Sequence, residues 1–278
     1  TRIVSLTQRS IAAIRYEVEP VNDVARVVVQ SEMVVNEPQP PPRANDPRVA
    51  AALRAPLRTE HHSSRDTRAT FVHRVVESGI GVASAMTHEW EAPGEVALEL
   101  YTGEDLGRFT LTTVLHPGET LTITKYLAYG WSSQRSAPAL RDQVDAALTA
   151  ARQTGWGGLL REQRMVLDEY WSLADVEIGG DAELQQAIRF ALFQVFQAGI
   201  RAERRPIAAK GLTGNGYDGH TFWDTEAFVL PVLAFCDHEA AADILRWRQS
   251  TLPQARQRAK SLGLAGAAFP WRTINGEE

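Results

Sequence analysis

Cysteine is almost absent from this sequence: Cys236 is the single one among 278 residues. One cysteine cannot form an intrachain disulfide, which excludes a disulfide-stapled secreted fold and favours a reducing compartment. No apolar run approaches the roughly 20 residues that a membrane helix needs. The chain also does not open with a basic segment followed by an apolar one. We therefore predict a cytoplasmic protein that does not enter a membrane.

Lysine is also scarce, since only three of the 29 basic residues are lysines and 26 are arginines. Codon bias in a GC-rich genome explains this more simply than an arginine-specific role. The formal net charge of −5, with scattered arginines, argues against a nucleic-acid partner. The seven histidines show no metal-binding spacing, and adjacent His61 and His62 are predicted to lie in a polar loop. No metal site is expected.

The first half of the chain contains short strand-like runs at intervals of 8–12 residues, with no helical pattern between them. Turn sequences at residues 93–95 and 117–119, both Pro-Gly-Glu, separate some of these runs. This spacing is typical of an antiparallel β-sandwich. Residues 38–43 are proline-rich and are predicted to form an exposed connection. The predicted strands are 11–18, 25–35, 70–76, 80–86, 96–100, 108–115 and 120–129.

The periodicity becomes helical at Ser136. Asp181 is a good N-cap for the clearest helix, in which apolar residues recur at helical spacing from Leu184 to Gly199. Other helices are predicted over about 136–151, 159–171, 239–250 and 253–262, the last ending at Gly263. Strands followed by helices indicate an α+β or two-domain chain rather than βαβ units.

A glycine-rich loop lies between two of these helices. Gly214, Gly216 and Gly219 match G-x-G-x-x-G formally, but a helical pattern precedes them where a dinucleotide site needs a strand. We therefore reject a nucleotide-binding fingerprint. Closely spaced glycines instead bring backbone close to a ligand or simply form a tight connection.

Polar and aromatic residues crowd just after this loop, at His220, Trp223, Asp224 and Glu226. An aromatic face stacks on sugar C–H groups and a carboxylate accepts hydrogen bonds from adjacent hydroxyls, so the mixture suits a sugar. The alternative is that Trp223 lies in the core and Asp224 caps the next helix. Asp224 and Glu226 are about 200° apart around a helix and make a poor acid/base pair. We therefore favour the interpretation that one of these carboxylates binds the ligand and the other has a structural role.

A second candidate cluster is the segment Phe269-Pro270-Trp271-Arg272. Trp271 and Arg272 could line a polar pocket. Equally, the apolar Phe-Pro-Trp run could cover the end of a helix. The residues alone leave both interpretations open.

These segments resemble glycoside hydrolase family 65, the family of maltose, trehalose and kojibiose phosphorylases and some trehalases. The resemblance is most specific in Lys210-Gly211-Leu212-Thr213-Gly214, in Gly219-His220-Thr221-Phe222-Trp223-Asp224-Thr225-Glu226, and in the segment 269–278. It implies an α+β multidomain fold: an antiparallel β-sandwich (1–132), a helical linker (133–180) and the first part of an (α/α)6 barrel (181–278).

The resemblance also implies a function, the inverting phosphorolysis of an α-glucosidic disaccharide to β-glucose 1-phosphate and glucose. Trehalose is favoured, partly because Arg272 replaces a glutamate found in other branches, while maltose or kojibiose stay possible. The implied sugar-binding residues are His220, Trp223, Asp224, Trp271 and Arg272. Inorganic phosphate would be a co-substrate, and no cofactor is expected. A homodimer is possible.

One implied element is missing from the sequence: the family's general acid, which is expected downstream of Glu278. We therefore expect an internal fragment of a longer enzyme, with little or no turnover by itself. A hydrolase of the same family and an inactive sugar-binding remnant stay open as alternatives.

Overall fold

The computed structural model describes residues 1–37, 55–214 and 216–277, and these form two compact units. The first unit takes in the described residues up to Arg164 and the second those from Met165 onward. The prediction for residues 38–43 lies outside the described residues. The two units are treated separately below.

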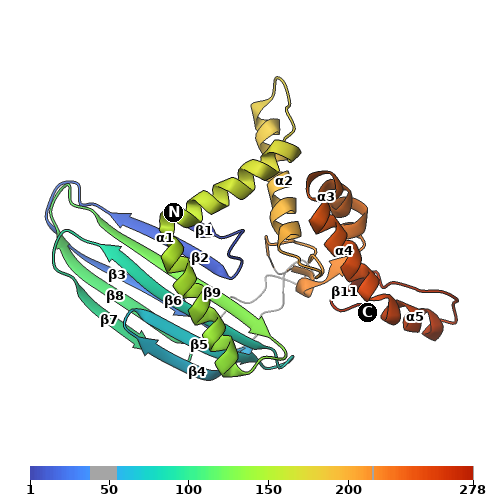
Figure 1. Cartoon of the computed structure of the whole chain (residues 1–278), viewed down its shortest axis with the longest axis horizontal. Coiled ribbons are helices and arrows are strands. Elements are labelled where there is room, and N and C mark those ends of the chain that lie inside the picture. The colour runs from blue at the N-terminus through green and yellow to red at the C-terminus, as the bar shows by residue number, and fades with distance from the viewer. Residues whose placement is uncertain (38–54, 215, 278) are drawn as a thin grey trace, which may run out of the picture. The chain divides into compact units, whose positions relative to one another are not determined.

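The first unit is built on two antiparallel sheets (Figure 1). A six-stranded sheet has the order β1-β2-β9-β6-β5-β4, and a three-stranded sheet has the order β3-β8-β7. The strands are β1 (Arg2–Val4), β2 (Ile11–Val18), β3 (Ala25–Val34), β4 (Leu57–Arg65), β5 (Arg68–Val75), β6 (Gly81–Glu91), β7 (Ala97–Thr102), β8 (Leu106–Leu115) and β9 (Leu121–Ser132).

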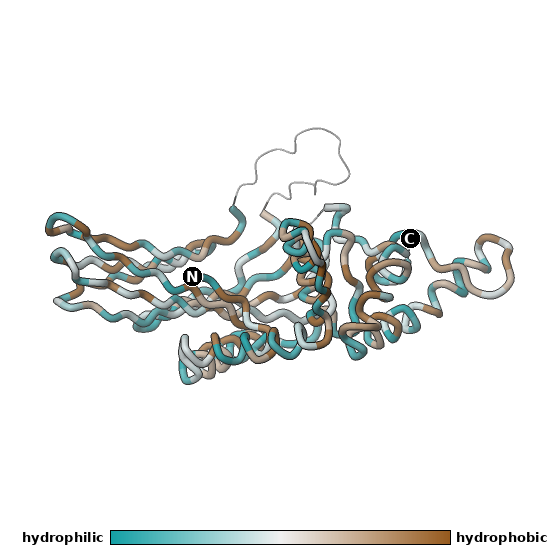
Figure 2. Tube along the Cα trace, turned by 90° about the horizontal axis from the view of Figure 1, so that it is seen from above, coloured by the Kyte–Doolittle hydropathy of each residue, from teal (hydrophilic) through white to brown (hydrophobic). Residues whose placement is uncertain are grey.

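The two sheets pack face to face, and β8 of the small sheet buries every second residue against the large one. Figure 2 shows the hydropathy of each residue along the chain. Phe109 and Leu111 of β8 are buried against Leu121 and Ile123 of β9. Phe71 of the large sheet packs in a second cluster with residues of the small one. The predicted antiparallel sandwich is therefore confirmed.

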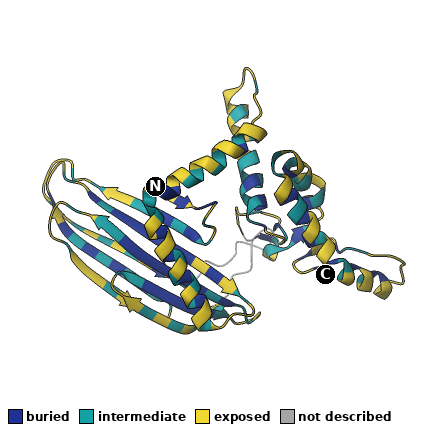
Figure 3. Ribbon diagram, viewed as in Figure 1, coloured by how far each residue is buried: buried dark blue, intermediate teal, exposed yellow. Residues whose placement is uncertain are grey.

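Helix α1 (Ala137–Ala174) covers the other face of the six-stranded sheet. Its buried residues Leu140, Val144, Leu148 and Ala151 fall on one helical face and pack on the sheet's small apolar side chains. Figure 3 shows this buried stripe along an otherwise exposed helix. Gly155, at a φ of 69°, interrupts the helix where the sequence predicts a break between two helices.

The expectation that His61 and His62 lie in a loop is wrong. Both belong to β4, which pairs with β5 and contains a register shift between Thr59 and His61. β4 lies at the edge of the sheet, and its side chains are half-buried or exposed. Because backbone pairing rather than apolar burial defines this strand, its polar sequence carries no strand signal.

A polar cluster is buried between the sheets. His88 and Lys125 are register partners on β6 and β9, and both are almost fully buried. The His88 ring stacks on Phe109 with centroids 4.1 Å apart, and its Nε2 lies 2.8 Å from the Ser31 hydroxyl. Lys125 Nζ donates to the Glu32 carbonyl. Among the described residues His88 Nδ1 has no hydrogen-bond partner.

The second unit is mainly helical. Asp181 caps α2 as predicted, because its Oδ1 accepts a hydrogen bond from Leu184 N at 2.9 Å. Gly263 ends α5 at a φ of +69°, again as predicted. None of the helices in the described part of the chain is long and apolar enough to cross a membrane. The elements are α2 (Ala182–Ile200), the 3-10 turn η1 (Gly216–Gly219), β10 (Thr221–Phe222), the π-helical turn η2 (Thr225–Val229), α3 (Leu230–Cys236), α4 (His238–Ser250), α5 (Leu252–Ser261) and β11 (Arg272–Thr273).

Candidate functional site

The two candidate clusters of the sequence meet in a short antiparallel ladder. Thr221 pairs with Thr273, and Phe222 pairs with Arg272, so β10 lies directly beside β11. The threonines are buried and anchor each strand, Thr221 to the Thr225 hydroxyl and Thr273 to the backbone of Gly276 and Glu277. This ladder places the residues around Trp223 next to those around Trp271.

Four aromatic rings form a continuous row across this ladder. The ring of Phe222 lies edge-on to Tyr217 at 5.4 Å and to Trp271 at 5.8 Å. Trp271 in turn lies edge-on to Trp223 at 5.6 Å. Trp223 is 46% exposed and Trp271 is 52% exposed, so both indoles present surface that a ligand could cover.

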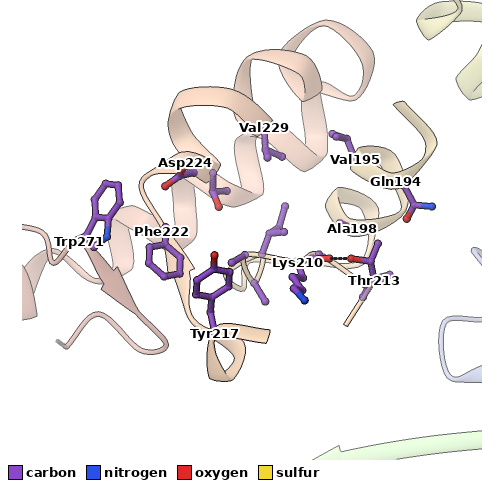
Figure 4. A pocket seen from close by; sticks show the side chains of 16 residues that line it. Gln194, Val195, Ala198, Lys210, Thr213, Tyr217, Phe222, Asp224, Val229 and Trp271 are labelled. Carbon is purple, nitrogen blue, oxygen red and sulfur yellow. Dashed lines mark hydrogen bonds between the residues drawn. The ribbon is translucent and has the colours of Figure 1, made fainter. Parts of the chain in front are cut away.

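A pocket of about 560 Å³ opens beside this row (Figure 4). Tyr217, Phe222 and Trp271 lie along one side of it, and Gln194 of α2 lies across from them. Lys210 and Asp224 are the charged side chains among its lining residues. The lining consists of Gln194, Val195, Ala198, Ile207, Ala208, Ala209, Lys210, Gly211, Leu212, Thr213, Tyr217, Phe222, Asp224, Thr225, Val229 and Trp271.

Three of the five predicted site residues lie in or beside this pocket. Asp224 and Trp271 line it, and Trp223 contacts Trp271 at its side. Trp223 is 46% exposed in the described part of the chain. Trp271 is half exposed and lines the pocket, whereas the preceding Phe269 and Pro270 are half-buried and buried.

His220 and Arg272 do not line the pocket. His220 Nδ1 lies 2.8 Å from the Tyr217 carbonyl oxygen. Because a carbonyl only accepts, Nδ1 is the donor in this hydrogen bond. This bond closes the turn that carries Tyr217. Arg272 lies in β11 with an exposed side chain.

The two carboxylates after the loop face different surroundings, in agreement with the sequence argument. Glu226 binds Arg248 through both oxygens, with Nε–Oε1 and Nη2–Oε2 distances of 2.7 and 2.9 Å. Asp224 is exposed, lines the pocket and accepts no capping hydrogen bond. It is therefore not the N-cap that the alternative required, and its oxygens are available to a ligand.

The glycine-rich loop supplies lining residues that the sequence argument did not single out, above all Lys210 and Tyr217. The Lys210 carbonyl accepts hydrogen bonds from the Thr213 backbone and hydroxyl, which closes the turn after it. Tyr217 and Asp218 adopt positive φ angles of 57° and 51°, which turns the chain sharply before β10. The rarity of lysine was a usable signal for Lys210.

The described residues contain no group of three metal-ligating side chains. The pocket's chemistry is that of exposed indoles, one carboxylate, one ammonium group and neutral hydrogen-bonding groups. It can stack on an apolar face of a ligand while hydrogen bonding to hydroxyl groups at its edge.

Gly276 lies in the turn after β11, and the Gly276→Ala substitution tests whether this turn tolerates a side chain. We expect Gly276→Ala to destabilise the second unit by about 1–3 kcal/mol. The residue has a φ of +100°, and a Cβ there would approach Thr251 Cβ to 2.7 Å, against the start of α5. Urea unfolding would measure the loss. Gly94→Ala is the control, because a Cβ at Gly94 meets nothing within 4 Å. Equal stability of the two variants would contradict the prediction.

Comparison with protein families matches both units to one family. The model of the glycosyl hydrolase family 65 N-terminal domain matches residues 1–170, and the model of its central catalytic domain matches residues 189–278. An uncharacterized glycosyl hydrolase of Mycobacterium tuberculosis is 56% identical over the whole chain, which covers 35% of that protein. The α,α-trehalose phosphorylase of Thermoanaerobacter brockii is 32% identical, with 100% of this chain and 36% of that protein covered.

A solved structure shares the fold. The "putative kojibiose phosphorylase from human microbiome" superposes with a TM-score of 0.86 at 23% identity, covering 100% of this chain and 35% of that one. The predicted order of a β-sandwich followed by the first helices of a helical barrel is therefore confirmed. The chain spans about a third of the length of the relatives it matches.

Proposed function

We propose that this chain, which belongs to glycoside hydrolase family 65, contributes the glucose-binding part of an enzyme that cleaves an α-glucosidic disaccharide. The observation that carries the proposal is the pocket beside the β10–β11 ladder, where both sequence clusters converge. Because the chain spans about a third of its relatives' length, the activity is proposed for a protein of that length.

The pocket suits one pyranose ring. Its volume of about 560 Å³ lies in the range of small-ligand sites. The exposed faces of Trp271 and Trp223 would stack on the sugar's C–H groups, and Asp224 would accept hydrogen bonds from two neighbouring hydroxyls. Lys210, at another part of the lining, would donate to a further hydroxyl.

We propose inverting phosphorolysis as the reaction, with trehalose as the favoured substrate. The family supports the reaction class, and the trehalose phosphorylase that aligns with the whole chain supports the substrate. In such a reaction an acid protonates the glycosidic oxygen while phosphate attacks C1 from the opposite face, which yields β-glucose 1-phosphate.

We assign the general acid to none of the described residues. Glu226 is unsuited, because Arg248 occupies both of its oxygens. Asp224 is placed to bind hydroxyls in this proposal. The resemblance implies that the acid belongs to another part of the enzyme.

Incubation of a protein of the relatives' length with trehalose, with and without phosphate, tests the reaction. Phosphate-dependent release of β-glucose 1-phosphate is expected. Glucose release without phosphate would instead support a hydrolase, the second candidate, which the name of the 56% identical mycobacterial relative favours. Turnover by residues 1–278 alone would contradict the placement of the acid.

Trp223→Ala tests the sugar-stacking role. We expect an approximately tenfold weaker affinity for glucose in this chain, because the loss of an aromatic stacking contact costs about 1.5 kcal/mol at most. Isothermal titration calorimetry with glucose would measure it. The matched control is Trp131→Ala in the first unit, because Trp131 is also about half exposed. Trp156 is unsuited because it packs on the core. Equal affinities of both variants and the wild type would remove Trp223 from the site.

A further inference from the structure

We propose that Arg248 is a positioning residue that holds the two sugar-binding segments against each other. The inference rests on the proposed glucose site, but its geometry is independent of the ligand. Arg248 lies on α4, which contributes no side chain to the pocket lining. It nevertheless contacts both segments that carry the pocket's aromatic and acidic groups.

The first contact fixes the segment that carries Trp223 and Asp224. The guanidinium donates from Nε and Nη2 to the two oxygens of Glu226, at 2.7 and 2.9 Å. Glu226 lies in the π-helical turn η2, two residues after Asp224. Two parallel hydrogen bonds to one carboxylate fix its direction as well as its distance. The start of η2 is thereby held at α4.

The second contact fixes the segment that carries Trp271. The same guanidinium lies over the Phe269 ring, 5.7 Å from its centroid, and over its neighbour Trp247 at 4.7 Å. Phe269 precedes Trp271 by two residues and is half-buried. The guanidinium of Arg248 thus contacts Trp247 of its own helix and Phe269 through its planar faces, while its N–H groups bind Glu226.

The burial of this pair distinguishes it from an ordinary surface ion pair. The side chains of Arg248 and Glu226 are only 11% and 23% exposed. An exposed pair contributes little, whereas a buried bidentate pair resists solvent and holds one geometry. A lysine at this position cannot form the two parallel bonds or present a planar face to Phe269.

The same helix offers a matched control in Arg246. Its guanidinium pairs with Asp243, three residues earlier, and its side chain is 51% exposed. Among the described residues it forms no hydrogen bond or ion pair with η2 or with residues 269–273. Replacing Arg246 therefore removes the same charge from α4 without touching either segment.

The spectroscopic test uses the Trp223–Trp271 pair. Two indoles 5.6 Å apart produce a coupled near-ultraviolet circular dichroism signal, which Trp223→Phe would identify. We expect Arg248→Gln and Arg248→Lys to lose this signal while the far-ultraviolet spectrum is retained, and Arg246→Gln to keep both. A retained signal in the Arg248 variants would overturn the proposal.

Glucose titration of the same variants of residues 1–278 measures the consequence for binding. We expect Arg248→Gln to bind glucose roughly tenfold more weakly, because ordering two segments that are no longer held in place costs binding free energy. Arg246→Gln should bind as the wild type does. Wild-type affinity in Arg248→Gln would overturn the proposal even if the spectrum changed.

Failure of the variant to fold and failure of the wild-type chain to bind glucose can each be told apart from failure of the proposal. If Arg248→Gln fails to fold, Glu226→Gln decides, because it leaves Arg248 in place and removes only the paired charge; an unchanged indole signal there would overturn the proposal. If the wild-type chain does not bind glucose, the proposed function fails, and the indole signal still tests the positioning role.

Discussion

Asp224→Ala is expected to weaken glucose binding by this chain about a hundredfold. In the proposed site Asp224 accepts hydrogen bonds from two sugar hydroxyls, and a hydrogen bond to a charged group contributes about 1.5–3 kcal/mol. The loss of two such bonds corresponds to roughly 3 kcal/mol or two orders of magnitude in affinity. The carboxylate is exposed, lines the pocket and has no capping role, so its removal should leave the fold intact.

Calorimetric titration with glucose would measure this loss, and two further variants sharpen the result. Asp224→Asn keeps the shape and one acceptor oxygen, so it should fall between alanine and the wild type. Glu183→Ala removes an exposed acid from the first turn of α2, away from the pocket lining, and should leave the affinity unchanged. Undiminished binding by Asp224→Ala would remove this residue from the sugar site.

The local chemistry of this site could be predicted from sequence because it follows from short-range geometry. Helical spacing alone separates Asp224 from Glu226, and the structure places one at the pocket and the other on Arg248. The juxtaposition of Trp223 and Trp271 could not be predicted in the same way. It depends on a ladder of two residues per strand, β10 with β11, which is too short to leave a periodic signal.

The lining residues on the glycine-rich loop were missed for a related reason. Tyr217 reaches the pocket through two consecutive residues with positive φ, a conformation that its own sequence does not favour. The surrounding hydrogen bonds, including that of His220 to the Tyr217 carbonyl, hold this turn. Such tertiary support cannot be read from the order of the residues.

The fold itself was largely predictable, since amphipathic patterns dominate it. Most strands of the two sheets and the helices α2, α4 and α5 appear where alternation and helical spacing place them, whereas α3 (Leu230–Cys236) was not predicted. Among the strands, β4 was missed because its polar residues His61 and His62 pair with β5 at the sheet edge. Backbone pairing at an edge needs no apolar pattern, so the sequence shows none.

Acid is expected to destabilise the first unit through His88. Burial, followed by the nearby positive charge of Lys125, lowers the pKa of His88 from 6.5 to about 3. Below pH 6.5 the unfolded chain therefore binds a proton that the folded chain refuses until about pH 3. Stability is present above pH 6.5 and falls as the pH drops through this window, by about 1.4 kcal/mol for each pH unit from this residue alone.

The structural reason is that a charged His88 would be a second cation beside Lys125 at a buried site. Its ring lies flat on Phe109 and bonds the Ser31 hydroxyl, while Nδ1 has no acceptor among the described residues and the facing residue is Lys125. Desolvation and repulsion from Lys125 outweigh the backbone hydrogen bond at Thr67 that favours the charged form, so the fold favours the neutral ring.

His88→Gln removes the titration and is the variant that tests it. Glutamine loses the ring stacking, so the variant should be less stable than the wild type at pH 7, but the difference in unfolding free energy between the two should shrink as the pH falls from 6.5 toward 4.

Urea unfolding followed by far-ultraviolet circular dichroism across this pH range measures the difference, in which the carboxylates common to both proteins cancel. His62→Gln, at an exposed site on β4, is the matched control and should keep the wild-type slope. A difference between wild type and His88→Gln that stays constant with pH would show that His88 titrates alike in the folded and unfolded chains, and would contradict the burial argument.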